Sequence, residues 1–364
     1  MEYGIAVAST TESWRVVKRA EELGFVEAWF YDTQLLNPDV FVCMALAAER
    51  TSRIRLATGV LIPSNRIAPV AANCIATLNR LAPGRIKLGV GTGFTGRRTM
   101  GLPAIRLADL REYVRVVEAL LGGETVEWET EGERRKIRFL NPDFGLINTR
   151  DPVPLAVSAF GPKARRLTAD LGAEWLNFGG TTDAAIAALE DMKSAWSDAG
   201  RAPEQLSAVE FTLGCVLRDG EAADGPRAKA QAGTLVAAFL HGLLETPELD
   251  GILGHLPPAI RQALAAYRPI YESYAPPDAR YLTLHRGHLM KLRPEEEPLV
   301  TADLLRALAW VGTAEELRAR VDALASAGYT QIAVQIVEGH EDAIEDWARV
   351  FGLAASSSSS TGGA

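Results

Sequence analysis

The stretch IRLATGVLIPSNRIAPVAANCIATLNRLAPGRIKLGV, residues 54–90, contains the pattern that decides the fold. It begins with a mainly apolar run at 54–61, which is typical of a strand buried on both faces. Apolar residues then recur at helical spacing over 69–81, where Pro69 suits the first turn of a helix. A second apolar run follows at 86–90. Strand, helix and strand in this order predict a β-α-β unit with two parallel strands.

The same alternation of short apolar runs and amphipathic segments continues along the 364-residue chain. The apolar runs predict eight strands, at residues 3–8, 27–31, 54–61, 86–90, 154–158, 175–178, 208–217 and 331–337. Residues 126–140 alternate in type around the turn Glu131-Gly132-Glu133 and predict an inserted hairpin. Eight parallel strands separated by helices favour a closed (β/α)8 TIM barrel over an open sheet, and such a barrel needs about 250 residues.

Two segments lie outside this repeat. Residues from about 225 to 310 are too many for an ordinary strand–helix connection, and the stretches 235–244 and 260–267 have helical apolar spacing. We therefore predict a helical insertion after strand seven that covers the barrel mouth, so that residues 1–354 form a single domain. The tail ASSSSSTGGA, residues 355–364, is of low complexity and is expected to be disordered.

Composition narrows the classes of function. The 46 acidic and 38 basic residues give a net charge of −8, which argues against a broad nucleic-acid-binding surface. No run reaches the roughly 18 apolar residues that suggest a membrane span. The first residues lack the basic and apolar regions of an export signal, so a cytoplasmic protein is expected. The cysteines form no CxxC pair and are expected to be buried thiols rather than ligands or disulfides: Cys43, Cys74 and Cys215.

In a barrel of this kind, the residues that act lie on the loops that follow the strands. After strand two comes Asp32, which is either a hydrogen-bond acceptor or general base in the pocket, or a turn aspartate. After strand three comes Gly59, which indicates a bulge or a close approach of the backbone. After strand four, Gly89, Gly91 and Gly93 alternate. We interpret this loop as a place where the backbone meets a ligand rather than as core packing.

Two further loops offer positive charge or free amides. Arg97 and Arg98 follow the glycine loop and are either a solvated face or a clamp for a phosphate or carboxylate. After strand five, Ser158 leads through Gly161 into a helix that carries Lys163. The N-terminus of a helix offers unpaired N–H groups and a partial positive charge. This is the best anion site in the sequence, and ordinary helix capping is the alternative.

The remaining candidates are glycines and histidines. Gly179 and Gly180 precede a predicted helix after strand six. His285 and His288 lie in the insertion with no pair of carboxylates nearby and a glycine between them, so no metal site is expected there. Each is either a structural histidine or an imidazole that faces the substrate. The sequence has no Ser-His-Asp signature, no P-loop and no HExxH motif.

Three stretches of the sequence resemble a known family of enzymes. They are residues 78–86 followed by GVGTG at 89–93, the segment 154–180, and WVGTAEE at 310–316. They resemble the bacterial-luciferase-like flavin oxidoreductases, in a branch similar to methylenetetrahydromethanopterin reductases. The resemblance spans most of the barrel and is weakest over the insertion. It implies a cofactor across the barrel mouth, which is reduced FMN or the deazaflavin F420.

The resemblance also implies roles for single residues. It implies a cis peptide between Gly59 and Val60, behind the cofactor ring, and a contact of Asp32 with the ring edge. The residues expected to bind the cofactor are Asp32, Gly59, Val60, Thr92, Gly93, Ser158, Ala159, Gly161, Pro162, Gly179 and Gly180. The candidates for catalysis are Asp32, Arg98 and His288.

Three functions follow as expectations. The first is a two-component monooxygenase that uses O2 and reduced FMN on a small organic substrate, with the FMN supplied by a separate reductase. The second is an F420-dependent reductase that transfers hydride to or from an unsaturated or imine-like carbon. The third is a flavin-binding protein without chemistry. Thr33 and Phe94 stand where deazaflavin-dependent sugar-phosphate dehydrogenases have histidine and glutamate, so that activity is rejected. The family also implies a homodimer.

Overall fold

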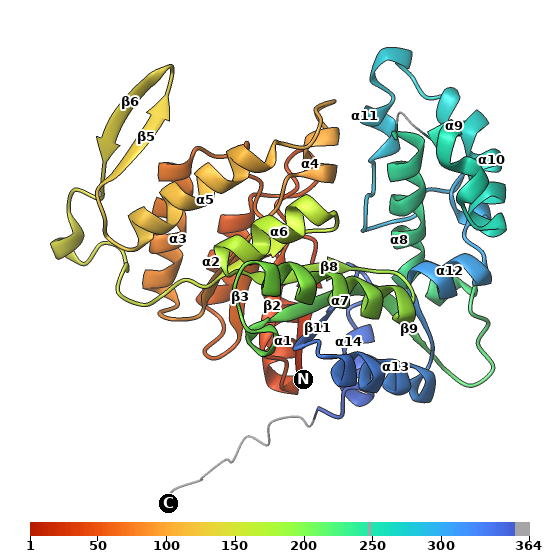
Figure 1. The fold of residues 1–364 in the computed structure, drawn as a ribbon. Helices are drawn as coiled ribbons and strands as arrows, with labels where there is room; N and C mark the ends of the chain where they lie inside the picture. The colour runs from red at the N-terminus through yellow and green to blue at the C-terminus, as the bar shows by residue number, and fades with distance from the viewer. Residues whose placement is uncertain (247–248, 354–364) are drawn as a thin grey trace, which may run out of the picture.

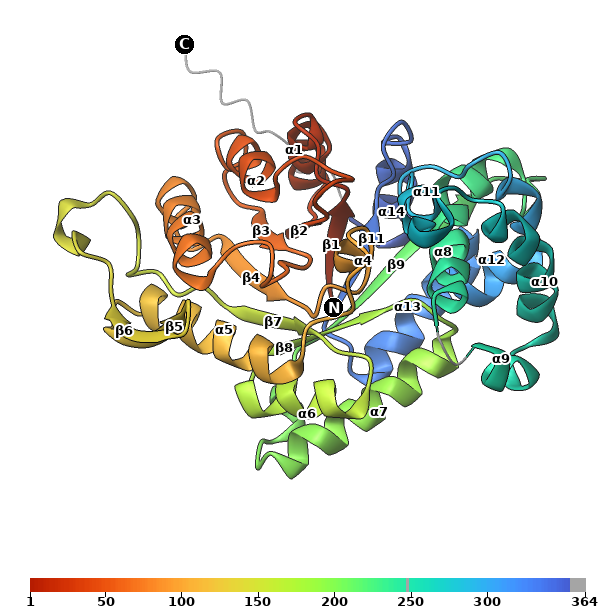
Figure 2. The same cartoon turned by 90° about the horizontal axis from the view of Figure 1, so that it is seen from above.

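A closed barrel of parallel strands forms the centre of the molecule (Figures 1 and 2). The computed structural model describes residues 1–246 and 249–353, so the predicted tail at 355–364 lies outside the described residues. The strands are β1 (Glu2–Val7), β2 (Glu27–Phe30), β3 (Arg55–Thr58), β4 (Ile86–Val90), β7 (Leu155–Ser158), β8 (Glu174–Phe178), β9 (Ala208–Leu217) and β11 (Gln331–Gln335). They pair in this order, and β11 pairs with β1 to close the ring. The predicted (β/α)8 TIM barrel is confirmed.

Helices surround the barrel, as the view from above shows (Figure 2). They are α1 (Ser13–Leu23), α2 (Val40–Ala48), α3 (Ala68–Leu81), α5 (Leu107–Leu121), α6 (Pro162–Leu171), α7 (Thr182–Asp198), α13 (Ala314–Ala327) and α14 (Ala343–Val350). Two short 3₁₀ helices, η1 (Pro142–Phe144) and η2 (Pro203–Gln205), lie in the connections. Side-chain caps mark the starts of α2, α7 and α13. In α13, for example, Thr313 and Glu316 form a reciprocal capping box.

The predicted hairpin is confirmed. Strands β5 (Val126–Thr130) and β6 (Glu133–Ile137) pair in antiparallel fashion and project away from the barrel (Figure 1). Glu131 and Gly132 connect them, and both have positive φ, as a two-residue hairpin turn requires.

A ninth parallel strand was not predicted. Strand β10 (Trp310–Thr313) pairs with the second half of β9, where Trp310 lies opposite Gly214. The first half of β9 pairs with β8 and β11 inside the barrel. The ten residues of β9 are therefore shared between the barrel and an extension. The apolar run at 208–217 predicts the strand but does not indicate this division.

The predicted helical insertion after the seventh barrel strand is also confirmed. It contains α8 (Pro226–Leu244), α9 (Leu249–Ile252), η3 (Leu253–His255), α10 (Pro258–Glu272), η4 (Pro277–Ala279), α11 (Tyr281–Leu284), η5 (Glu297–Leu299) and α12 (Ala302–Leu308). These helices bury an apolar cluster of their own, in which Val236, Leu264 and Leu304 are almost completely buried. The insertion stands beside the upper rim of the barrel, next to the short helix α4 (Phe94–Arg98) (Figure 1).

Below the mouth, side chains fill the barrel interior. Trp29 donates from Nε1 to Gln331, whose amide donates to Glu27. Lys87 joins this layer through Glu27 at 2.9 Å and Glu174 at 2.7 Å. These charges can be buried because they are paired. The side chains of this layer fill the space and close the barrel from below. Any ligand site at the strand ends must therefore open upward.

Three further expectations concern the cysteines, the membrane and the surface charge. All three cysteines are free thiols. Cys43 and Cys215 are buried as predicted, whereas Cys74 is only half-buried because it lies at the edge of the α3 contact.

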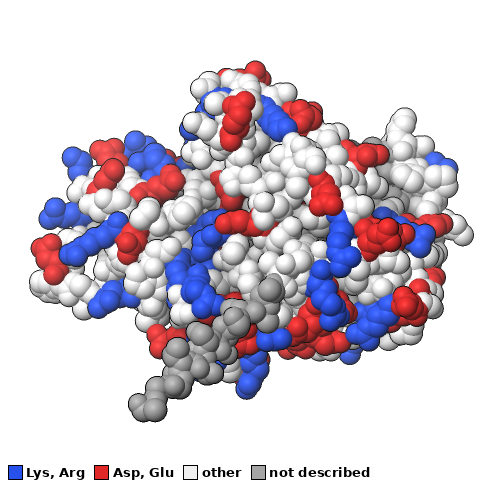
Figure 3. Space-filling view, turned by 90° about the horizontal axis from the view of Figure 1, so that it is seen from below, with Lys and Arg blue, Asp and Glu red and all other residues white. Residues whose placement is uncertain are grey.

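None of the helices in the described part combines the length and apolarity that crossing a bilayer requires. On the face seen from below, basic and acidic side chains are interspersed (Figure 3).

Candidate active site

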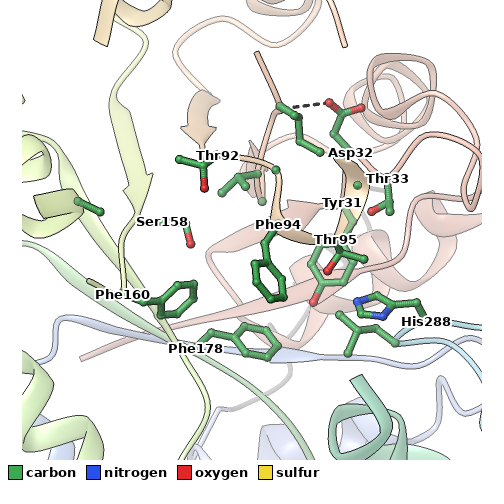
Figure 4. Close-up of a pocket in the computed structure, with 18 of the residues that line it drawn as sticks. Tyr31, Asp32, Thr33, Thr92, Phe94, Thr95, Ser158, Phe160, Phe178 and His288 are labelled. Atoms are coloured by element: carbon green, nitrogen blue, oxygen red, sulfur yellow. Dashed lines mark hydrogen bonds between the residues drawn. The ribbon is translucent and has the colours of Figure 1, made fainter. Parts of the chain in front are cut away.

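A cavity of about 430 Å³ opens at the carboxyl ends of the barrel strands (Figure 4). In barrels of this kind, this is the end where active sites lie. The lining includes eight of the residues expected to act or to bind a cofactor: Asp32, Gly59, Val60, Thr92, Gly93, Ser158, Gly161 and His288. These residues come from the ends of β2, β3, β4 and β7 and from the insertion. The structure therefore brings together most of the predicted site.

The wall at the ends of β3 and β4 is built from backbone. The peptide bond between Gly59 and Val60 is cis, as the family resemblance implies. A Cβ atom added at Gly91 would lie 2.6 Å from Val60 Cγ2 and 3.6 Å from the Cβ of Ser158. Because that contact is too close, glycine at 91 leaves room for Val60 to form a smooth wall. A smooth wall suits a flat ring.

Gly89 has a different role from the one expected. A Cβ at this position would lie 2.1 Å from the carbonyl oxygen of Thr58 on the neighbouring strand. Thr58 also exchanges hydrogen bonds with Gly89 through its hydroxyl, at 2.7 and 3.0 Å. The expectation that core packing does not explain this glycine is therefore wrong, because close packing of β3 against β4 requires it.

Asp32 lies in the cavity wall and is almost completely buried. Its carboxylate accepts hydrogen bonds from the backbone N–H of Ile62 at 3.2 Å and from the Asn65 amide at 3.2 Å. Arg66 adds an ion pair at 2.9 Å. Its two oxygens thus hold the loop after β3 in place. The carboxylate thus uses its hydrogen-bonding capacity on Ile62, Asn65 and Arg66, which gives it a structural role in the cavity wall.

Aromatic rings surround the centre of the cavity. Phe94 on α4, Phe160 after β7 and Phe178 at the end of β8 lie around it (Figure 4). Phe94 and Phe160 are 52% and 55% exposed, which is unusual for phenylalanine and marks surface left for a ligand. Aromatic rings stack favourably on flat ligands.

The start of α6 is the place where the sequence predicts an anion site. Gly161 is the N-cap residue, Pro162 opens the helix, and no side chain caps this end. Ser158 and Gly161 line the cavity, and Lys163, two residues after Gly161, is exposed. Pro162 has no N–H, and the N–H groups of Ala164 and Arg165 donate to the Gly161 carbonyl, so an anion here would meet the N–H groups of Gly161 and Lys163 and the helix dipole. Ala159 does not line the cavity, because its side chain is buried and its carbonyl accepts from Trp175 at 2.8 Å.

Three further expected residues lie away from the cavity lining. Gly179 and Gly180 follow β8 with positive φ and lead into α7, and Arg320 donates to the carbonyl of Gly180. Arg98 turns to the insertion: it contacts Glu245 at 3.1 Å and the Gly242 carbonyl at 3.3 Å. Its guanidinium also lies 3.8 Å from the ring centre of Phe94. Arg98 thus links α4 to the insertion.

His288 is the insertion's polar contribution to the cavity. Burial, and then its neighbours His241 and His285, lower the pKa of His288 well below its ordinary value, so its ring is neutral at pH 7. Its Nδ1 atom is buried and has no hydrogen-bond partner among the described residues. The other predicted histidine, His285, is buried and hydrogen-bonded to Glu245 at 3.2 Å.

Sequence reasoning missed several lining residues. They include Tyr31, Asn37, Phe160, Phe178 and Leu289. Tyr31 and Phe178 close the predicted strands at 27–31 and 175–178, and only residues after the strands were considered. Their position as the last strand residue was the available signal. Leu289 lies in the insertion, where no spacing pattern connects it to the barrel.

Comparison with known proteins adds relatives over the full length. The 5,10-methylenetetrahydromethanopterin reductase of Methanolobus tindarius is 26% identical over 86% of this chain and 87% of its own. That of Archaeoglobus fulgidus is 25% identical over 91% and 92%. An F420-dependent glucose-6-phosphate dehydrogenase of Beutenbergia cavernae is 38% identical over 37% of this chain, and the match spans only 40% of that enzyme's length.

The fold has matches among solved structures. The coenzyme F420 dependent tetrahydromethanopterin reductase from Methanopyrus kandleri superposes with a TM-score of 0.70 at 23% identity, covering 96% of this chain and 97% of that one. A monooxygenase from Streptomyces bottropensis superposes with a TM-score of 0.61 at 20% identity, covering 96% and 97%. The model of the luciferase-like monooxygenase family matches residues 4–331. This chain therefore belongs to the luciferase-like monooxygenase family of oxidoreductases.

Proposed function

We propose that this chain binds coenzyme F420 in the mouth cavity and catalyses hydride transfer involving an unsaturated or imine-like carbon of a small substrate. The observation that carries the proposal is the alignment with two methylenetetrahydromethanopterin reductases over nearly the whole of all three chains. Other family members are FMN enzymes by name, so FMN fits as the alternative cofactor.

The residues of the cavity fit a flat, anionic cofactor. Val60, kept in place by the small size of Gly91, supplies a wall for one ring face. Phe160 offers exposed aromatic surface, and Ser158 and the amides at the start of α6 suit the acidic arm. The described lining contains no lysine or arginine, so backbone amides supply most of the positive potential there.

The proposed reaction also fits the ionisable groups. F420, when bound, supplies a hydride donor or acceptor. Asp32 is the only carboxylate in the described lining, and its charge is paired with Arg66. His288 is neutral. Oxidation of an alcohol needs a base for the hydroxyl proton, whereas hydride addition to an iminium-like carbon needs none. Phe94 stands where sugar-phosphate dehydrogenases have a glutamate, and it lines the cavity, which agrees with the rejection of sugar-phosphate oxidation.

The two-component FMN monooxygenase remains the second candidate. The family description favours it, since the luciferase-like family is named for monooxygenases. A separate reductase would then be needed, and the half-buried cavity beside the insertion would have to exclude water. The reductase partner, the small-molecule substrate and a homodimer remain predictions.

One titration separates these functions. The purified protein is mixed with F420H2 or with reduced FMN, binding is followed by fluorescence, and oxygen uptake is recorded. We expect tight F420 binding with no oxygen uptake above that of free cofactor. Oxygen consumption that requires both reduced FMN and the protein would refute the proposal in favour of the monooxygenase. Binding of neither cofactor would also contradict the proposal.

A further inference from the structure

Three of the five histidines converge inside the insertion. His241 lies on α8, and His285 and His288 follow α11. Their ring centres lie 5.8–6.3 Å apart. One ring nitrogen of each lies within 4.8 Å of one nitrogen of each of the others. The sequence gives no hint of this cluster, because His241 stands in an ordinary helical stretch more than forty positions before its partners.

Two carboxylates fix the protonation of two of these rings. Nε2 of His241 lies 2.7 Å from Glu296, which also accepts from Tyr267 at 2.6 Å and from Arg293. Because Tyr267 and Arg293 both donate to the same oxygen of Glu296, this oxygen is a hydrogen-bond acceptor. His241 must therefore donate from Nε2, which leaves a lone pair on its Nδ1.

His285 repeats this arrangement. Its Nε2 lies 3.2 Å from Glu245, whose other oxygen pairs with Arg98 at 3.1 Å. Nε2 again donates, and Nδ1 again keeps its lone pair. His241 and His285 are 2% and 4% exposed. Each thus has a buried acceptor atom that water does not reach.

None of the three Nδ1 atoms has a hydrogen-bond partner in the described part of the chain. Two neighbouring lone pairs cannot bond to each other, and an unpaired buried acceptor costs about 1–3 kcal/mol. One group that satisfies all three nitrogens at once is a cation.

We propose that His241, His285 and His288 bind a divalent transition-metal cation of the zinc class through their Nδ1 atoms. Imidazoles that donate their other N–H to a carboxylate are the usual zinc ligands. Zinc–nitrogen bonds of about 2.0–2.1 Å place ligand nitrogens about 3.4 Å apart, whereas one ring nitrogen of each histidine lies within 4.8 Å of one nitrogen of each of the others, so the rings must move closer or turn when the metal binds. Three protein ligands leave a fourth position, and His288 lies in the cavity wall beside it.

This proposal goes beyond the proposed hydride transfer and does not depend on it. The full chain is produced without a polyhistidine tag, stripped with a chelator, dialysed against Zn²⁺ or Co²⁺ and analysed for metal content. We expect about one equivalent of either metal, and intense visible bands of Co²⁺ in a four-coordinate nitrogen site. Less than a tenth of an equivalent of bound metal would overturn the proposal, because the histidine nitrogens would then be bonded to water alone.

The remaining two histidines provide a matched control. His255 and His340 lie outside the cluster, so the double variant H255Q/H340Q should bind zinc as the wild type does. H285Q and H288Q should each weaken zinc binding at least tenfold in a chelator competition. E245Q keeps all three ligands and should weaken it about 10–100-fold by losing the acceptor behind His285. Equal affinity in H288Q and the wild type, or loss of binding in the control, would contradict the assignment. H288Q removes a half-buried ring without a hydrogen bond, so it tests the site even where H285Q does not fold.

Discussion

A negative charge at the start of α6 should expel the acidic arm of the cofactor. Gly161 is suited to this test because its φ of −89° and ψ of 160° are open to any residue. A Cβ added there meets no atom within 4 Å. Both G161E and G161Q should therefore fold, and the two side chains differ mainly in charge. Comparison of these two variants isolates the electrostatic effect from that of added bulk.

The size of the effect follows from Coulomb's law. A carboxylate about 6 Å from a phosphate at an effective dielectric constant of about 20 costs about 2.8 kcal/mol. Gly161 is exposed, so salt at physiological strength halves this to about 1.4 kcal/mol. We therefore expect G161E to bind F420 or FMN about tenfold more weakly than G161Q.

The assay is a fluorescence titration of both variants at low and at high salt. The ratio of the two dissociation constants should be about ten at physiological salt, should rise towards about 100 at low salt, and should shrink as more salt is added. Equal affinities at low salt would show that the acidic arm lies elsewhere and would remove the main physical argument for this anion site. Circular dichroism of both variants checks that the barrel is intact.

Three other changes test the remaining parts of the structure. G91A should push Val60 into the cavity, because the new methyl group would lie 2.6 Å from the Cγ2 of Val60. The variant should bind the cofactor at least tenfold more weakly. Unchanged affinity would mean that this wall does not touch the cofactor ring. R98M leaves Glu245 without its cation and should destabilise the insertion by about 1–2 kcal/mol. The loss should appear as faster hydrogen exchange in α8 but not in α3. Exchange in α8 at the wild-type rate would contradict the role of Arg98 in linking α4 to the insertion. Burial raises the pKa of Glu210 to about 7, so the folded state binds more protons than the unfolded state above pH 4.5, and stability falls as pH rises through this window. E210Q should remove about 2 kcal/mol of this fall in the free energy of unfolding between about pH 5.5 and 7, as measured by chemical unfolding. If the free energy of unfolding changes with pH equally in the variant and the wild type, the raised pKa of Glu210 is refuted.

The barrel was predictable because each strand is short, apolar and followed by a helix. Strand β4, at Ile86–Val90, is buried along its whole length, so its sequence is apolar except for Lys87, whose charge is paired with Glu27 and Glu174. The hairpin was predictable from Glu131 and Gly132, which form the kind of turn that a two-residue connection needs. The cis bond at Gly59 was implied by the family resemblance, since neither the composition nor the spacing of the residues indicates one.

The histidine cluster was not predictable for a physical reason. Its supporting partners, Tyr267 and Glu296, approach His241 from positions 26 and 55 residues away. Metal motifs are recognised when ligands share one helix or one turn, and here the insertion must fold before the rings meet. The expectation of no nearby carboxylate considered only residues adjacent in sequence to His285, whereas Glu245 reaches that ring from 40 residues away.

Arg98 and the start of α6 have different roles, although the sequence offered both as candidates for binding an anion. Arg98 is neutralised by Glu245, and that carboxylate also holds His285, so Arg98 ties the mouth of the barrel to the insertion. It has little charge left for a phosphate. No lysine or arginine is among the described residues that line the cavity. An anionic cofactor there must rely on the amides at Gly161 and on exposed Lys163, and fixed backbone dipoles lose no side-chain entropy when they bind.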